Sequence, residues 1–376
     1  MEIHDEQFFS DTYEIARERF RSLIQTLQGD LSSYTISALS PSGDPLTIDI
    51  GRIGPQDADH TLIISSGTHG VEGFFGSAVQ LSYLHLTSRH VLPPRTAIIM
   101  IHAVNPFGFA HLRRVNEDNI DLNRNFLRSH ELYDGADPGY VIMNPLLNPT
   151  SPPQRIEFFL WRALMAIARH GFNSLKNSVA QGQYEYPRGL FYGGKNQSES
   201  ARVILTHLPT WIGDAHNITH LDLHTGLGRW GSYVIAGDQD LDDASWERLA
   251  QTFGHRWVQS LNQEGVLYTI RGEFTAGCQN LFPHLTYDPL LAEFGTYPVL
   301  KVLAALRREN QATHTCAPND PRLKAARLRL KEMFAPADPG WRRLVVQRGT
   351  QVVSQALKAL SESPHTGESL RHPSQV

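Results

Sequence analysis

The fold of this chain can be predicted outward from one stretch of sequence, Thr61-Leu62-Ile63-Ile64-Ser65-Ser66-Gly67-Thr68-His69-Gly70-Val71-Glu72-Gly73. Its first residues are apolar and partly β-branched, as expected of a buried strand, and the glycines that follow permit a sharp turn. His69 and Glu72 lie three residues apart in that turn, a spacing that places two side chains on one side of a helical turn. An imidazole and a carboxylate are ligands that a catalytic zinc ion takes from a protein, with a third ligand from elsewhere.

Taken alone, the pair of His69 and Glu72 is a weak signal. The chain contains 18 histidines, so about one His-x-x-Glu is expected by chance in a protein of ordinary composition. A glycine-rich turn with a polar surface would carry the same residues. A metal site therefore requires further ligands at the ends of other strands.

Apolar runs of strand length alternate with helical periodicity along the chain. Strands are expected within the hairpin 34–53 and at 61–65, 97–101, 218–224, 233–236, 266–270 and 290–295, and helices at 12–28, 74–86, 154–170, 199–212, 297–309, 320–334 and 344–360. This alternation predicts an α/β fold, with a mixed, mostly parallel twisted sheet flanked by helices in a single domain. Ligands of such sheets bind at the carboxyl ends of strands. Four candidate side chains lie at or just after predicted strand ends, namely His69, Glu72, His224 and Glu293.

We expect residues 1–360 to form one catalytic domain with an insertion at about 130–212, and residues 361–376 to be a disordered tail. Within the insertion, residues 134–153 are rich in Pro, Asn and Gly and are expected to be irregular. The apolar run 156–167, interrupted by Glu157 and Arg162, predicts a buried helix. The loop 181–197 fits either an ordinary surface loop or a loop that covers the substrate.

Composition narrows the class of function. Of 376 residues, 41% are hydrophobic and 19% charged, so a sizeable core is expected. The net charge of −4 gives no indication of the basic face that nucleic-acid binding needs. No apolar run reaches the ~18 residues of a membrane span. The polar, acidic N-terminus lacks a signal peptide, and the only two cysteines, Cys278 and Cys316, favour a reducing compartment. We therefore expect a cytoplasmic protein without a nucleic-acid or membrane partner.

Four short motifs follow one another in the chain: His69-Gly70-Val71-Glu72, Asp121-Leu122-Asn123-Arg124-Asn125-Phe126, Leu221-Asp222-Leu223-His224-Thr225-Gly226 and Ala292-Glu293-Phe294-Gly295-Thr296. In this order they resemble the zinc carboxypeptidase superfamily, which includes carboxypeptidase A and the succinylglutamate desuccinylase/aspartoacylase group. The chain is most similar to a bacterial branch of that superfamily. The resemblance covers roughly residues 55–310.

The resemblance implies one Zn²⁺ ion per chain, held by His69, Glu72 and His224. It implies that Asp121 holds His69 and thereby fixes the tautomer and orientation of the imidazole ring. It also implies that Glu293 is the general base for the zinc water and then the proton donor to the leaving amine.

The resemblance further implies how a substrate would be held. Asn123 and Arg124 would bind a substrate carboxylate, which a planar guanidinium contacts at two points. Arg114 would polarise the scissile carbonyl and stabilise the oxyanion, and Arg113 is the alternative residue for that role. Asp222 fits either a support of the site or a stabiliser of the turn. An active-site phenol is common in the superfamily, and the sequence does not place any of the three candidates, Tyr184, Tyr192 and Tyr287.

The expected function is a zinc-dependent hydrolase of the metallocarboxypeptidase type, which cleaves an amide bond next to a free carboxylate in a small peptide or acyl amino acid. An N-acyl-amino-acid deacylase or esterase of the aspartoacylase type is the alternative among enzymes. A catalytically silent relative that binds a carboxylate ligand is an alternative of another class, although a binding protein would not need Glu293. A serine hydrolase is disfavoured because the chain contains no Gly-x-Ser-x-Gly.

Overall fold

A single sheet of eight strands organises the computed structural model, which describes residues 5–88, 91–155, 157–237, 243–260 and 270–362. The strand order is β1-β2-β4-β3-β5-β8-β6-β7. The strands are β1 (Asp30–Leu39), β2 (Pro45–Ile53), β3 (His60–Ser66), β4 (Thr96–His102), β5 (Asn217–Thr225), β6 (Tyr233–Gly237), β7 (Val258–Ser260) and β8 (Thr286–Phe294).

Parallel pairing dominates the middle of the sheet. Strand β3 pairs in parallel with β4 and β5, and β5 pairs in parallel with β8. The hairpin β1–β2 is antiparallel and joins β4 at one edge, and β6 joins β8 in the antiparallel sense near the other edge. This mixed α/β sheet confirms the fold class predicted from the alternation of strands and helices.

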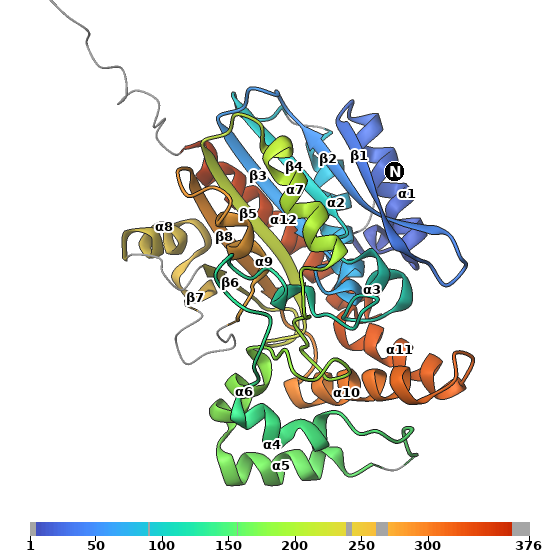
Figure 1. The fold of residues 1–376 in the computed structure, drawn as a ribbon. Helices are drawn as coiled ribbons and strands as arrows, with labels where there is room; N and C mark the ends of the chain where they lie inside the picture. The colour runs from blue at the N-terminus through green and yellow to red at the C-terminus, as the bar shows by residue number, and fades with distance from the viewer. Residues whose placement is uncertain (1–4, 89–90, 156, 238–242, 261–269, 363–376) are drawn as a thin grey trace, which may run out of the picture.

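Helices lie on both faces of the sheet, with α7 in front of it and α12 behind it in Figure 1. The helices are α1 (Tyr13–Thr26), α2 (Gly73–Thr87), α3 (Pro106–His111), α4 (Pro138–Leu147), α5 (Phe159–His170), α6 (Phe172–Ala180), α7 (Glu199–Ile212), α8 (Asp243–Phe253), α9 (Phe274–Gln279), α10 (Val299–Thr315), α11 (Pro321–Phe334) and α12 (Pro339–Ser361). Because both faces are covered, every residue of β3, β4 and β5 is buried. None of the helices described has the length and apolar composition that crossing a bilayer requires.

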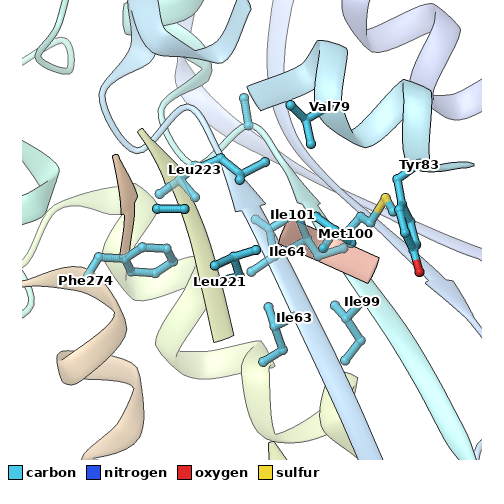
Figure 2. Close-up of a cluster of buried hydrophobic side chains, with 14 of the residues drawn as sticks. Ile63, Ile64, Val79, Tyr83, Ile99, Met100, Ile101, Leu221, Leu223 and Phe274 are labelled. Carbon is cyan, nitrogen blue, oxygen red and sulfur yellow. The ribbon is translucent and has the colours of Figure 1, made fainter. Parts of the chain in front are cut away.

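The main core lies between the central strands and the helices that cover them. Figure 2 shows Ile63 of β3, Met100 of β4 and Leu221 of β5 in this cluster, with Val79 of α2 nearby. All four side chains are buried, and burial of each contributes about 1.5–3 kcal/mol relative to exposure. This packing holds the ends of the central strands in fixed positions.

Two expectations for the insertion are wrong. Residues 134–153 are not irregular throughout, because Asp137 caps helix α4 through Gly139 N and Pro138 occupies its first turn. The apolar run 156–167 does not form a buried helix, because α5 buries only Phe159 and Ala163 and leaves Trp161 64% exposed. Figure 1 shows α5 at the outer edge of the molecule.

We use the name insertion module for α4, α5 and α6, at residues 138–180. These helices pack against one another, and α5 also contacts α10. The proposed bounds of the insertion, 130–212, stay a prediction. The strand expected at 266–270 and the tail expected at 361–376 fall mainly on residues 261–269 and 363–376, which lie outside the described ranges. Cys278 and Cys316 are free thiols.

Candidate metal centre and active site

The candidate site lies at the carboxyl ends of β3, β5 and β8. Ser66 at the end of β3 is in register with Leu223 of β5, and the turn that carries His69 follows directly. His224 of β5 is in register with Glu293 of β8. Three neighbouring parallel strands therefore bring the candidate side chains to one edge of the sheet, where ligands bind in α/β proteins.

The His69 turn is held tightly against the next connection in the chain. Gly70 N donates to Arg114 O at 3.1 Å, and Val71 N donates to Arg113 O at 2.9 Å. A Cβ on Gly70 would approach the backbone of Gly108 to 2.2 Å. Glycine is required here for the close approach of two backbones, and that approach fixes the position of His69.

Three donor atoms converge in the turn. His69 Nδ1 lies 2.9 Å from Glu72 Oε1, and His224 Nδ1 lies 3.1 Å from both Glu72 Oε2 and His69 Nδ1. All three side chains are buried. A tetrahedral zinc ion with bonds of about 2.0–2.1 Å separates its ligand atoms by roughly 3.3 Å. The observed separations are a few tenths of an ångström shorter, so this His₂Glu set fits zinc after a small outward shift.

Two carboxylates hold the far nitrogens of the imidazole rings. Asp121 Oδ1 lies 3.0 Å from His69 Nε2, and Asp222 Oδ2 lies 2.5 Å from His224 Nε2. A carboxylate that accepts from Nε2–H leaves Nδ1 with a lone pair for a metal. Asp222, for which the sequence left two roles open, lies beside His224 and also accepts from Ser65 Oγ at 2.6 Å.

Two buried carboxyl groups of the cluster, Asp121 and Glu72, are ionised. Burial opposes ionisation of Asp121, but Arg114, Arg124 and His69 outweigh it and hold the pKa of that carboxyl well below its usual range. Burial likewise opposes ionisation of Glu72, and His69 with His224 lowers its pKa below the usual range. Both groups are therefore carboxylates at neutral pH, and ionised Glu72 can serve as the anionic member of the ligand set.

The structure places the two adjacent arginines differently. Arg114 donates from Nε to Asp121 Oδ2 at 3.1 Å and from Nη1 to Glu72 Oε1 at 3.2 Å, and it lines the cavity next to the site. Arg113 donates to Glu309 Oε1 at 2.8 Å and to Asn119 Oδ1 at 2.9 Å, and it is not part of the cavity lining. Arg114 is thus the guanidinium of the pair that lies at the site.

Glu293 completes the polar end of the cavity. Its Oε1 accepts from Leu227 N at 2.7 Å. Burial, together with the nearby carboxylate of Glu72, raises the pKa of Glu293 to about 8. A carboxyl group with a pKa near neutrality can both accept and return a proton during a reaction.

Arg124 and Asn123, both expected to bind a substrate carboxylate, lie in different surroundings. Asn123 lines the cavity, but the Arg124 side chain is fully buried and outside the lining. Its guanidinium donates to Ala180 O at 2.6 and 3.1 Å and to Asn123 O at 3.0 Å. These bonds tie the Asn123 turn to the end of α6, so direct binding of a substrate carboxylate by Arg124 stays a prediction.

None of the three candidate tyrosines lies on the cavity. The Tyr287 hydroxyl pairs with His220 Nδ1 at 2.7 Å, Tyr184 donates to Arg124 O at 2.8 Å, and Tyr192 is buried. The loop 181–197 contributes Phe191 to the cavity instead. The ring of Phe191 lies 5.6 Å from the guanidinium carbon of Arg114.

The cavity itself has a volume of about 260 Å³. Its polar end is formed by His69, Glu72, Arg114, Asn123, His224 and Glu293. The remaining wall is largely apolar and comes from the insertion module and α10, which sequence reasoning missed. Apolar pairs four residues apart, such as Ala163 with Ile167 and Leu175 with Val179, are the signal that could have indicated it.

Several solved structures that resemble this chain are carboxypeptidases or relatives of them. Carboxypeptidase A from Helicoverpa armigera superposes with a TM-score of 0.51 at 13% identity, over 93% of this chain and 73% of that chain. Metallo-carboxypeptidase from Burkholderia cenocepacia gives 0.41 at 12% identity, over 91% and 68%. Bovine thrombin-activatable fibrinolysis inhibitor, in complex with tick carboxypeptidase inhibitor, gives 0.46 at 12% identity, over 86% and 97%. The first of these superpositions shows that the chain has a carboxypeptidase A-like fold.

The particular family follows from the sequence. Residues 9–348 match the family described as "Protein of unknown function (DUF2817)", and the chain belongs to that family. No curated protein matches the sequence.

Proposed function

We propose that this chain is a zinc-dependent hydrolase that cleaves an amide bond next to a free carboxylate in a small peptide or acyl amino acid. One observation carries the proposal. His69, Glu72 and His224 converge at the polar end of a cavity, and Glu293, in register with His224, lines the same end. Metal-assisted hydrolysis requires a set of metal ligands and, beside it, a carboxyl group that can accept and return a proton, as a raised pKa allows.

The metal ligands and Glu293 have separate roles in the proposed reaction. Zinc bound to the three ligands would supply a Lewis acid and lower the pKa of water to about 7. Glu293 takes a proton from the attacking water and returns it to the nitrogen of the leaving amine. The hydrogen bond from Leu227 N to Oε1 fixes this carboxyl and leaves Oε2 for the proton.

Arg114 supports the charge that develops on the substrate oxygen. Its guanidinium is held by Asp121 and Glu72, so it is oriented before the reaction begins. Arg114 and Asn123 are the cationic and amide groups of the lining that a substrate carboxylate can reach at this end of the cavity. A catalytically silent relative has no use for Glu293, which disfavours the binding-protein alternative.

The carboxylate requirement is tested with zinc-loaded wild-type enzyme, an N-acyl amino acid and its carboxamide. Loss of a charge from a buried pair costs about 2–5 kcal/mol, so kcat/KM should be roughly 30- to 5,000-fold lower for the carboxamide. Glu293→Gln serves as the blank for contaminating hydrolases. Equal rates on the two substrates would exclude a hydrolase of the carboxypeptidase type. They would favour a deacylase or esterase that does not bind the substrate carboxylate.

A further inference from the structure

We propose that the substrate carries an extended apolar group next to the scissile amide, and that this group binds between the insertion module and α10. The scissile amide itself rests on the proposed function, whereas the binding of an apolar group does not. The evidence is the chemistry of the cavity wall beyond the metal ligands.

Each helix of the insertion module contributes apolar side chains to one wall. Met143 and Leu147 come from α4, Ala163 and Ile167 from α5, and Leu175 and Val179 from α6. In every helix the two residues are four positions apart, which places them on one face of the helix. Three consecutive helices therefore present the same kind of apolar face to one cavity.

The opposite wall repeats this pattern. Val302 and Leu306 of α10 line the cavity at the same spacing, and Phe334 at the end of α11 lines it nearer the metal ligands. These residues also belong to a hydrophobic cluster shared by the insertion module, α10 and α11. The cavity is thus an opening in the module's own core, continuous with the catalytic end.

Charge on this wall is scarce. Among the described lining residues outside the polar end, Lys176 is the one charged side chain. A short polar acyl group would leave the wall without a matching partner, whereas an alkyl or aromatic group would remove apolar surface from water on both sides. Two sources supply such a group: a long fatty acyl chain, or a large apolar amino-acid side chain.

Two substrate series distinguish these sources. The first varies the acyl chain of N-acyl-alanine from two to fourteen carbons, and the second keeps an N-acetyl group and varies the amino acid from Ala through Leu to Phe. Burial of one methylene group should raise kcat/KM about three- to fourfold until the cavity is full. The series that rises identifies the source. Flat profiles in both series would overturn the proposal.

Two wall variants and one matched control connect the effect to this cavity. Ala163→Phe fills the wall, and Ile167→Asn makes it polar at a partly exposed position. Ala168→Phe adds the same ring to the same helix at an exposed residue outside the lining. In whichever series rises, the ratio of kcat/KM for the largest apolar group to that for the smallest should fall at least tenfold in both wall variants and stay unchanged in Ala168→Phe. Equal ratios in all four proteins would contradict the assignment.

Binding without turnover separates this inference from the proposed function. The probe is a dansyl-labelled undecanoate, titrated by fluorescence and displaced by dodecanoate. Wild type and Ala168→Phe should bind it with the same Kd, and Ile167→Asn at least fivefold more weakly. Probe binding without hydrolysis of any amide would sustain this inference and refute the proposed function. Hydrolysis of short substrates, without probe binding and without a rise in either substrate series, would refute this inference and sustain the proposed function.

Discussion

His224 and Glu293 are partners on neighbouring strands, and this single register pairing brings a candidate metal ligand next to a carboxyl group of raised pKa. The same pairing gives each residue a separate function that substitution can isolate. In the proposed function, His224 binds the metal and Glu293 transfers the proton.

Glu293→Gln should abolish proton transfer while it keeps size and the hydrogen bond from Leu227 N. General acid–base groups contribute about 10²–10⁴-fold, so kcat should fall by that factor with zinc content unchanged. Steady-state kinetics and metal analysis measure both quantities. Asp288→Asn, at the other end of the same strand, is the matched control. Wild-type kcat in Glu293→Gln would exclude Glu293 as the base.

Asp222→Asn should weaken zinc binding without removal of a ligand. The carboxylate holds His224 Nε2 at 2.5 Å, and loss of such a partner costs about 10- to 100-fold in metal affinity. Competition with a chromophoric chelator measures the zinc Kd. If the affinity is unchanged, Asp222 serves the turn alone, which is the other role that the sequence allowed.

The position of a site residue could be predicted from the sequence only where its contact partners lie close to it in the chain. His69 and Glu72 are three residues apart, so their convergence follows from one turn. The position of Arg124 depends on the carbonyl of Ala180, which is 56 residues away in the chain. Sequence motifs carry no information about that contact, and the substrate role expected of Arg124 was predicted without it.

At the scale of elements, α5 shows where composition misleads. Its apolar residues are numerous enough to indicate a buried helix, yet part of its apolar face points away from the module. One face packs in the module, and Leu160, Trp161, Leu164 and Met165 on the rest of the helix are exposed. A lone apolar run cannot show which neighbours will cover it, because that depends on where the insertion lies on the fold.

Phe159→Ala and Trp161→Gln test this description of α5. Phe159 is buried under the guanidinium of Arg307, so its removal should cost about 3–5 kcal/mol. Trp161 is exposed, so its replacement should change the free energy of unfolding by less than about 0.5 kcal/mol. Urea titration measures both. A large loss in Trp161→Gln would show that the helix is buried after all.

At the scale of the whole molecule, the alternation of strands and helices predicted the α/β sheet, because each element's periodicity is local. The strand order could not be predicted from the sequence, because it depends on pairings between distant residues. His60 of β3 pairs with Thr96 of β4, 36 positions away, and with Asn217 of β5, 157 positions away. The insertion module was missed as a helical unit for the same reason.

Two histidines of the core make the stability of the whole fold depend on pH. His102 contacts Ser77 Oγ at 3.1 Å and His220 contacts Ser65 Oγ at 3.0 Å. Burial lowers the pKa of both imidazoles from 6.5 to about 4. The unfolded chain therefore takes up protons before the folded chain does. Stability is fully present above pH 6.5 and is lost as the pH falls from 6.5 toward 4.

Each of these histidines should remove about 2 kcal/mol of stability at pH 5 relative to pH 7. Urea unfolding at the two pH values, with a chelator present throughout, measures the loss. His102→Gln cannot take up the proton and should lose about 2 kcal/mol less than wild type between pH 7 and pH 5. Equal losses in the two proteins would show that His102 does not titrate between these states.

Metal content tests the central claim most directly. Wild type, Glu293→Gln and His224→Ala are equilibrated with zinc, freed of excess metal by gel filtration and measured by mass spectrometry for zinc per chain. We predict about one zinc ion per chain in wild type and Glu293→Gln, as a three-ligand catalytic site requires. We predict almost none in His224→Ala, with the fold retained by circular dichroism. Full zinc occupancy in folded His224→Ala, or no zinc in wild type, would contradict the metal centre and the hydrolase built on it.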